Sequence, residues 1–366
     1  MSYSPFRHTG SIFRKKDPVQ VTFFLTRRCN AKCPFCFYLS RNGNGKESAE
    51  LSTEEIEKVS RSMGNLLWLA FSGGEIFLRD DLAWITRIFY KHNKPAIILL
   101  PTNGLLPDRV REQTEKILKH CKKSTIVVKL SLDGPEEIND SLRGTDGAFR
   151  KTLETYRALE NLSGKYRNFE LGINTVFCSA NQAYMDETIA FINGLDKIRT
   201  HTVSLIRGDV SDEHLKEVDI EKYRETTERM ESDIRKGLTG RYRFRGARLK
   251  AAQDIIQHRL IYKTAGRKKR LIPCYAGRLN VVITETGDVY SCESFANKMG
   301  NARESGYDMG RLLKSKEARE AIQSIKNNAC FCTHECYMLT NILFNPAMYP
   351  ALLREYMRIM DSPASA

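Results

Sequence analysis

The sequence predicts an α/β fold: a partial (β/α)6 TIM barrel followed by a small C-terminal α+β extension. Apolar, strand-like runs alternate with amphipathic stretches six times, and polar or glycine-rich residues follow the ends of these runs. This alternation implies a parallel sheet with right-handed crossovers. Six units, fewer than the eight of a closed barrel, predict an open barrel with room for a large substrate.

The predicted elements follow one another along the first 207 residues. Strands are expected at 19–26, 66–71, 95–101, 124–132, 168–177 and 200–206. Helices are expected at 52–64, 80–92, 107–121, 148–161 and 182–194. The first helix has a good start signal, because Ser52 supplies a hydroxyl N-cap and Glu54 and Glu55 place acids in its first turn.

The remaining sequence changes character twice. Residues 207–271 are predicted to be helical and basic, and VVITETGDVYSC then predicts a hairpin with a Gly-Asp turn. The chain is expected to divide into four parts: an N-terminal segment (1–18), the barrel (19–207), a basic helical region (208–272) and an extension with a C-terminal helix (273–366).

Composition predicts a cytoplasmic protein with metal or redox chemistry. No apolar stretch approaches the ~18 to 20 residues that a membrane span needs, and the N-terminus lacks the apolar region of a signal peptide. The chain contains 10 cysteines. In a cytosolic protein, cysteines indicate metal or redox sites in preference to disulfides. Cys121 and Cys178 are expected to be ordinary buried thiols.

Three cysteines, Cys29, Cys33 and Cys36, lie close together in TRRCNAKCPFCFYLS, directly after the first predicted strand. Three thiolates on one short loop are ligands for a cluster or a metal. A tetrahedral zinc site needs a fourth ligand, and no further cysteine or histidine follows nearby. An iron–sulfur cluster held by three cysteines leaves one iron open for a small molecule. The C-x3-C-x2-C spacing, with Phe35 before the last cysteine, resembles that of radical S-adenosylmethionine (SAM) enzymes.

Further strand-end motifs are similar to those of the same family and occur in the same order. They are Ser72-Gly73-Gly74-Glu75, Thr102-Asn103-Gly104, Ser131-Leu132-Asp133-Gly134 and Arg143-Gly144. A Gly-Gly pair also suits a plain tight turn. At a strand end, however, two glycines let a ligand approach the backbone closely, with their amides as donors.

The resemblance implies that Cys29, Cys33 and Cys36 hold a catalytic 4Fe–4S cluster whose open iron binds SAM. One electron, from a flavodoxin- or ferredoxin-type donor, would cleave SAM to methionine and a 5′-deoxyadenosyl radical. That radical would abstract hydrogen from an unactivated substrate carbon. The resemblance assigns SAM binding to these residues: Ser72, Gly73, Gly74, Glu75, Asn103, Ser131, Arg143, Asn174, Leu205 and Ile206. Gly73, Gly74 and Glu75 would hold the amine of SAM, and Arg143 its carboxylate.

A second group of cysteines follows the basic region. It contains Cys274-x12-Gly287-x4-Cys292 and then Cys330, Cys332 and Cys336. A structural zinc site is one interpretation. The pattern also resembles the SPASM and twitch extensions of radical SAM enzymes, and five cysteines favour the twitch form with one auxiliary 4Fe–4S cluster. The expected ligands are Cys274, Cys292, Cys332 and Cys336, with Cys330 as the substitute. His334 would be a ligand or a hydrogen-bond partner to one.

The substrate is less defined. Residues 241–270 contain eleven Lys or Arg and one acid, Asp254, within a chain of net charge +14. A solvated helical face is one reading; the other is a site for an anionic small molecule or a lipid headgroup, peripheral to a membrane surface. A peptide substrate would need a separate leader-binding carrier, because about eighteen residues precede the first strand. A non-catalytic iron–sulfur or zinc scaffold is the alternative of another class.

Overall fold

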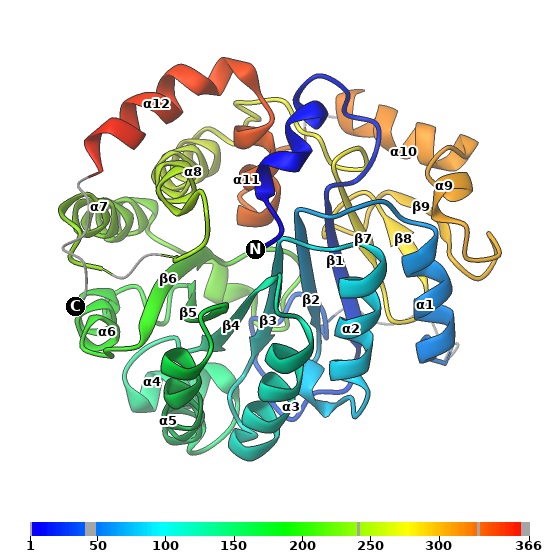
Figure 1. The fold of residues 1–366 in the computed structure, drawn as a ribbon. Coiled ribbons are helices and arrows are strands. Elements are labelled where there is room, and N and C mark those ends of the chain that lie inside the picture. Colours follow the sequence, from blue (N-terminus) through cyan, green and yellow to red (C-terminus); the bar gives the residue numbers. More distant parts are fainter. Residues whose placement is uncertain (1, 41–48, 240–241, 328–329, 360–366) are drawn as a thin grey trace.

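The computed structural model describes residues 2–40, 49–239, 242–327 and 330–359. These residues build one mixed sheet with the strand order β6-β5-β4-β3-β2-β1-β7-β8-β9 (Figure 1). The six barrel strands are β1 (Gln20–Thr26), β2 (Trp68–Gly73), β3 (Ile97–Thr102), β4 (Thr125–Ser131), β5 (Phe169–Phe177) and β6 (Ile198–Leu205). The extension supplies β7 (Asn280–Ile283), β8 (Asp288–Tyr290) and β9 (Lys298–Asn301).

Helices cover the outer surface of the sheet. In the barrel they are α1 (Thr53–Arg61), α2 (Leu82–His92), α3 (Pro107–His120), α4 (Glu136–Arg143), α5 (Ala148–Lys165) and α6 (Met185–Asn193). After the barrel come α7 (Ile220–Lys236), α8 (Ala247–Arg267), α9 (Met309–Leu312), α10 (Lys316–Asn327), α11 (Glu335–Leu343) and α12 (Tyr349–Arg358). Short 3-10 helices are η1 (Pro5–Ile12), η2 (Ile76–Leu78), η3 (Glu213–Lys216) and η4 (Pro346–Met348).

The predicted α/β partial barrel is confirmed. All six predicted strands pair in parallel in sequence order, and the five predicted helices lie between them. The short helix α4 was not predicted, because Asn139, Asp140 and Ser141 are weak helix formers at its centre. The predicted hairpin is present as β7 and β8, which pair antiparallel.

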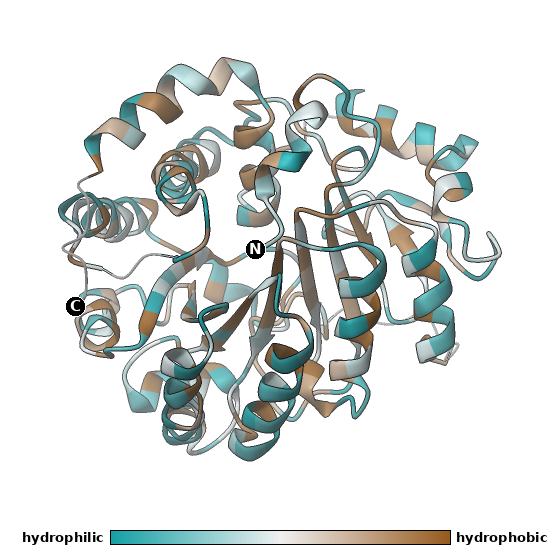
Figure 2. Cartoon of the chain, in the orientation of Figure 1, coloured by the Kyte–Doolittle hydropathy of each residue, from teal (hydrophilic) through white to brown (hydrophobic). Residues whose placement is uncertain are grey.

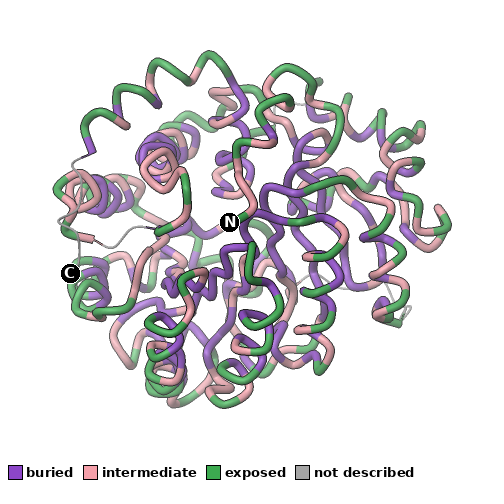
Figure 3. Tube along the Cα trace, viewed as in Figure 1, coloured by how far each residue is buried: buried purple, intermediate pink, exposed green. Residues whose placement is uncertain are grey.

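The core explains why the strands are continuous apolar runs. Every residue of β1 is buried, as expected for a parallel strand that is covered on both faces. Phe23 of β1 and Phe71 of β2 each meet Phe89 of α2 edge to face, with ring centroids 6.0 Å apart. The strands are mostly hydrophobic and the outer faces of the helices hydrophilic (Figure 2), and burial follows the same division (Figure 3).

The extension continues the barrel sheet. β7 pairs in parallel with β1, in a register that runs from Gln20 opposite Asn280 to Phe23 opposite Ile283. The two cysteine-bearing parts of the chain are therefore joined by backbone hydrogen bonds between neighbouring strands.

The basic helix α8 packs against α7, α11 and α12. Arg259 of α8 forms ion pairs of 2.8 Å with Glu231 of α7 and with Glu355 of α12. Both glutamates are buried. Across the described ranges, no helix is long and apolar enough to span a membrane.

Candidate active site

The three loop cysteines lie at one end of a cavity of about 400 Å³ inside the barrel. Backbone N–H groups point at their sulfur atoms: Ala31 N lies 3.5 Å from Cys29 Sγ, and Leu39 N lies 3.4 Å from Cys36 Sγ. Such donors stabilise a thiolate. The loop therefore offers three sulfur ligands that face one space.

The loop is held in place by the end of α4. Lys32 N donates to the carbonyl of Arg143 at 3.1 Å. Gly144, which caps α4 with φ 59°, lies so close that a Cβ there would come within 2.4 Å of Lys32 O. Only glycine tolerates both the positive φ and this approach. The Arg143-Gly144 pair thus shapes the cysteine loop directly.

The Gly-Gly pair after β2 also packs against the cysteine-bearing chain. A Cβ on Gly73 would lie 2.4 Å from Thr26 O, and one on Gly74 would lie 2.1 Å from Arg28 O. Gly74 N donates to Thr26 O at 2.7 Å. The close approach expected from the sequence is present, but its partner is the backbone that leads into the cysteine loop. The Gly74 amide is therefore already used within the chain.

Glu75 is buried and fully engaged. Its carboxylate accepts hydrogen bonds from Phe77 N at 3.1 Å, Asn103 N at 2.8 Å and Thr102 Oγ1 at 3.0 Å. Burial raises the pKa of Glu75 to about 7, and these hydrogen bonds oppose that rise. Glu75 thereby fixes the end of β3 beside the end of β2. Its assigned contact with SAM remains a prediction.

Arg143 has a protein partner that the sequence reasoning missed. It forms an ion pair with Asp133, whose side chain has no exposed surface. Asp133 also accepts a hydrogen bond from Val176 N at 2.8 Å. The Arg143 guanidinium lies 5.2 Å from the centre of the Phe35 ring, and its Nη1 lies 3.9 Å from Cys33 Sγ. The sequence did contain a signal for Asp133, because this residue belongs to the strand-end motif Ser131-Leu132-Asp133-Gly134.

The structure brings the sequence-predicted site residues of the barrel together. All of the following line the same cavity: Cys29, Cys33, Cys36, Ser72, Gly73, Gly74, Glu75, Asn103, Ser131, Arg143, Asn174, Leu205 and Ile206. The grouping follows from the sheet, because the carboxyl ends of parallel strands meet at one edge. Asn103 Nδ2 reaches the loop itself, at 2.8 Å from Asn30 Oδ1 and 3.8 Å from Cys29 Sγ.

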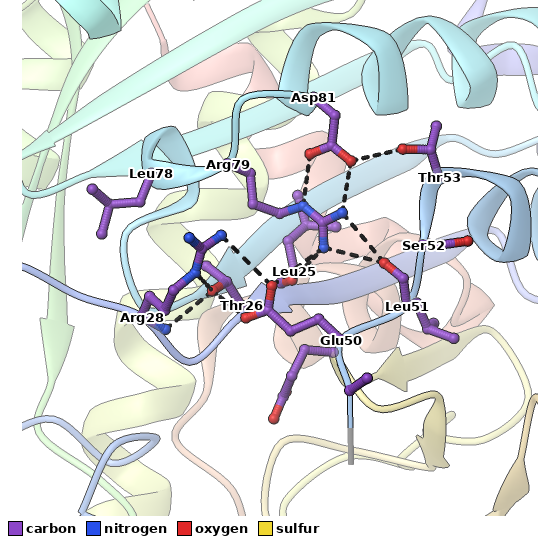
Figure 4. Close-up of polar contacts among 12 residues, drawn as sticks. Leu25, Thr26, Arg28, Glu50, Leu51, Ser52, Thr53, Leu78, Arg79 and Asp81 are labelled. Carbon is purple, nitrogen blue, oxygen red and sulfur yellow. Dashed lines mark hydrogen bonds and ion pairs between the residues drawn. The ribbon is translucent and has the colours of Figure 1, made fainter. Parts of the chain in front are cut away.

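A buried arginine that the sequence did not reveal anchors the end of β1 (Figure 4). Arg79 Nη1 donates to Leu25 O at 3.1 Å and to Leu51 O at 3.3 Å. Its Nη2 pairs with Asp81 at 2.7 Å, and Asp81 also accepts a hydrogen bond from Thr53 at 2.7 Å. Arg79 therefore ties the strand that leads into the cysteine loop to the start of α1.

The C-terminal cysteines converge from separate segments. Cys274, Cys292 and Cys336 pack around one apolar cluster with Phe295 and Tyr337. Cys332 is exposed as a residue, but desolvation of its thiol raises its pKa, and the nearby charges of Cys274 and Cys292 raise it further. The predicted set Cys274, Cys292, Cys332 and Cys336 is therefore close in space.

Cys330 lies beside Arg270, with its Sγ 3.9 Å from Arg270 Nη1. Cys330 and Cys332 are both exposed, whereas Cys274, Cys292 and Cys336 are half-buried. Of the five C-terminal cysteines, Cys336 alone lines the barrel cavity.

A charged network lies beside Cys336. Cys336 N donates to His334 Nδ1 at 3.2 Å, and His334 Nε2 lies next to Glu293 and 2.8 Å from Arg207 Nη2. Burial raises the pKa of Glu293, but His334 and Arg207 outweigh it and lower the value to about 2. Glu293, His334 and Cys336 place ligand atoms within 4.8 Å of one another.

Most of the basic run makes contacts within the protein. Arg243 pairs with Glu170, Lys250 with Asp254 and Arg259 with two glutamates, and Arg270 donates to Ile325 O and Lys326 O. Arg267, Lys268 and Lys269 are exposed and do not line the cavity. Arg241 lies outside the described residues.

The barrel is similar to known proteins. Residues 23–192 match the family model for the Radical SAM superfamily. That family uses a 4Fe–4S cluster and SAM.

Individual relatives differ in what their names describe. The AdoMet-dependent heme synthase of Methanosarcina barkeri is 27% identical over 302 residues, which cover 79% of this chain and 81% of that protein. AlbA of Bacillus subtilis, an antilisterial bacteriocin subtilosin biosynthesis protein, is 33% identical over 147 residues, or 39% of this chain and 31% of that protein. The solved structure of anSMEcpe with bound AdoMet has a TM-score of 0.63 at 19% identity, covers 94% of this chain and 96% of that one, and supports the fold.

Proposed function

We propose that this protein is a radical SAM enzyme that acts on an anionic small molecule. The observation that carries the proposal is that three loop cysteines and every predicted SAM-binding residue line one cavity. When bound, the cluster supplies the electron that cleaves SAM, and the resulting 5′-deoxyadenosyl radical abstracts hydrogen from an unactivated substrate carbon. The electron would come from a flavodoxin- or ferredoxin-type protein in the cytoplasm.

The chemistry of the donors fits a 4Fe–4S cluster held by three thiolates. Cys29, Cys33 and Cys36 are the sulfur donors, and hydrogen bonds to sulfur tune such clusters. The positive charge of Arg143 lowers the pKa of Cys33, against the burial that raises it to about 11. Binding of iron would deprotonate the thiols outright.

The same wall fits SAM. Arg143 Nε is buried and has no hydrogen-bond partner among the described residues, so it remains a donor for the carboxylate of SAM. Asn103, Ser131 and Asn174 add polar side chains along three neighbouring strand ends. Gly73, Gly74 and Glu75 line the same cavity and keep its backbone in place, and they would hold the amine of SAM.

For the C-terminal group we propose a twitch-type auxiliary 4Fe–4S cluster. Its ligands would be Cys274, Cys292, Cys332 and Cys336, and it would carry electrons or anchor the substrate. The convergence of these cysteines around one apolar cluster supports this assignment. A structural zinc ion is the competing occupant.

Two relatives favour different substrates. The heme synthase, which matches over most of both chains, favours a small molecule. AlbA favours a second candidate function, maturation of a peptide delivered by a separate leader-binding partner. We favour the small molecule, because the site is an internal cavity and the heme synthase match covers more of the sequence.

Anaerobic reconstitution with iron and sulfide tests the proposal. Two clusters predict about eight irons per chain, and incubation with SAM and dithionite is expected to produce 5′-deoxyadenosine. Zinc in place of the second cluster would leave about four irons. Absence of 5′-deoxyadenosine from a fully loaded sample would contradict the enzyme assignment and favour a scaffold.

A further inference from the structure

One buried lysine inside the barrel lies beyond the residues assigned to SAM. Lys129 precedes Ser131 by two positions on β4, so both face the barrel interior and Lys129 lies one layer deeper. Lys129 lines the cavity and is 8% exposed. Its ammonium donates to Thr202 Oγ1 on β6, which leaves two of its three N–H groups without a partner among the described residues.

A glycine makes room for this side chain. Gly172 of β5 lies between Lys129 of β4 and Thr200 of β6 in the strand register. A Cβ on Gly172 would lie 3.5 Å from Lys129 Cε and 2.7 Å from Thr200 Oγ1. The absence of a side chain there lets Lys129 cross β5 and reach β6.

Lys129 differs from the other cations of the cavity wall. Among the described residues, the cations that line the cavity are Lys129, Arg143, Arg207 and Lys250. Arg143 pairs with Asp133, Arg207 with Glu293 and Glu335, and Lys250 with Asp254. Within the described part of the chain, no carboxylate forms an ion pair with Lys129.

No ion pair therefore neutralises the charge on Lys129 within the described residues, and the charges of Asp254 and Glu335 favour its ammonium form only from farther away. Burial, followed by the charge of Lys250, lowers its pKa to about 8, so the ammonium form dominates at neutral pH. An unpaired buried ammonium destabilises a folded protein, and nearby Thr202 supplies no charge. A ligand anion would remove this penalty.

His258 of α8 supplies a neutral donor in the same cavity. It is 4% exposed, and its Nδ1 is buried without a hydrogen-bond partner among the described residues. Burial lowers its pKa to about 4, so the ring is neutral and one nitrogen carries a proton. Lys129 and His258 line the same cavity, and a positive charge and an N–H donor both suit an oxyanion.

His201, the other buried histidine in this region, does not suit an anion. The Thr175 hydroxyl donates to Leu132 O at 2.6 Å, so His201 Nε2, 2.8 Å from Thr175 Oγ1, must be the donor in that contact. Burial lowers the pKa of His201 to about 3, so the ring is neutral and its Nδ1 is an acceptor. An acceptor repels a carboxylate.

We infer that Lys129 and His258 bind a carboxylate group of the substrate, which makes the substrate a small carboxylic acid. The inference rests on the proposed function only in taking this cavity as the substrate site. Lys129 holds the charge and His258 orients the group, with the remaining substrate directed toward the SAM-lined end of the cavity.

The test is calorimetric titration of the reconstituted enzyme, saturated with SAM, with hexanoate and with its neutral analogue hexanamide. Hexanoate is expected to bind and hexanamide to bind at least tenfold more weakly. Lys129→Met and His258→Leu are each expected to weaken hexanoate binding about tenfold. The matched control Lys151→Met, at an exposed lysine of α5, is expected to bind as the wild type does.

Equal binding of hexanoate and hexanamide, or wild-type affinity for hexanoate in Lys129→Met, would overturn the inference. Loss of hexanoate binding in the presence of SAM would also overturn it, because Lys129 would then bind the carboxylate of SAM. Replacement of an unpaired buried ammonium by an apolar chain of similar shape is expected to keep or raise the melting temperature. A lower melting temperature in Lys129→Met would mean that Lys129 is structural. Hexanoate binding without 5′-deoxyadenosine formation by the wild type would support this site while contradicting the proposed function.

Discussion

The two cysteine groups are assembled in opposite ways. Cys29, Cys33 and Cys36 lie on a single loop after β1. The C-terminal cysteines come from a segment before β7, a segment after β8, and the residues that lead into and begin α11. The first group is set mainly by spacing along the chain. The second exists only once the hairpin and α11 have packed, so its geometry depends on the tertiary fold.

Their surroundings differ as well. The barrel cysteines face a cavity in which Asn103 and Arg143 lie beside them, and Cys274, Cys292 and Cys336 pack among aromatic rings. Cys36 touches both environments, because it also contacts the aromatic cluster of the second group. The comparison teaches that the ligands on a local loop can be placed from their spacing alone, whereas the ligands of a site gathered from three segments are placed only by tertiary packing.

The largest expected effect comes from removing the loop cysteines. The combined variant Cys29→Ala, Cys33→Ala and Cys36→Ala is expected to lose about four irons and all 5′-deoxyadenosine formation, because the open cluster has no ligands. The C-terminal iron is expected to remain. Loss of all iron would show that the two groups do not load independently, and retained SAM cleavage would contradict the assignment.

Breaking the Asp133–Arg143 pair is expected to weaken the barrel group. Asp133→Asn leaves a buried guanidinium without its counter-charge, which costs about 3 to 5 kcal/mol in unfolding free energy. The backbone carbonyl of Arg143 also accepts a hydrogen bond from Lys32 N in the cysteine loop. Iron loading of this loop is therefore expected to fall, while iron loading of the C-terminal group is expected to stay unchanged.

The matched control is Glu136→Gln, which removes the exposed pair with Arg150 and is expected to cost less than about 1 kcal/mol. Urea unfolding and iron counts measure both effects. Equal losses in the two variants would contradict a special role for the buried pair.

Within the C-terminal group, single replacements are expected to rank the ligands. Cys336→Ser is expected to lose the second cluster, because Cys336 packs in the aromatic cluster with Cys274 and Cys292. Cys330→Ser is expected to keep it, because Cys330 lies outside that cluster and beside Arg270. Iron counts and electron paramagnetic resonance of the reduced protein measure the outcome. The reverse ranking would make Cys330 a ligand and Cys336 a cavity residue.

Glu75 is expected to make stability depend on pH. Its pKa is raised by burial from 4.5 to about 7, so between these values the folded protein binds the proton that the unfolded chain has lost. Stability therefore falls as pH rises from 4.5 to 7, by on the order of 3 kcal/mol. In Glu75→Gln this slope is expected to be absent. Unfolding of the metal-free proteins across this range measures the difference, and parallel curves would contradict it.

The smallest effect is expected from the exposed end of α8. Combined replacement of Arg267, Lys268 and Lys269 by Glu is expected to leave 5′-deoxyadenosine formation and hexanoate binding within twofold, because these residues lie outside the cavity. Arg270 is left unchanged, since it bonds to the end of α10. A tenfold loss of hexanoate binding or of 5′-deoxyadenosine formation at low salt would indicate that the basic run is an anion site.

The sequence could predict what is periodic or local. Six strands followed from apolar runs, and the strand-end motifs followed from the edge that parallel strands share. Asp133, Arg79, Lys129 and His258 could not be assigned, because their roles depend on partners from other elements. Lys129, for example, is explained by Gly172 on the next strand and Thr202 on the one after it. The sequence could not show which cations of the basic run are paired, because partners such as Glu231 and Glu355 of Arg259 lie on α7 and α12.

The pairing of β1 with β7 has a consequence for synthesis on the ribosome. Cys29 leaves the ribosome early, but one edge of β1 stays unpaired until Ile283 has emerged. At about 5 to 20 residues per second, that delay is roughly 10 to 50 s. A nascent chain in this state exposes a bare strand edge beside reactive thiols, which invites aggregation and premature oxidation. Chaperone binding to the emerging chain would protect both until the last quarter of the protein closes the sheet.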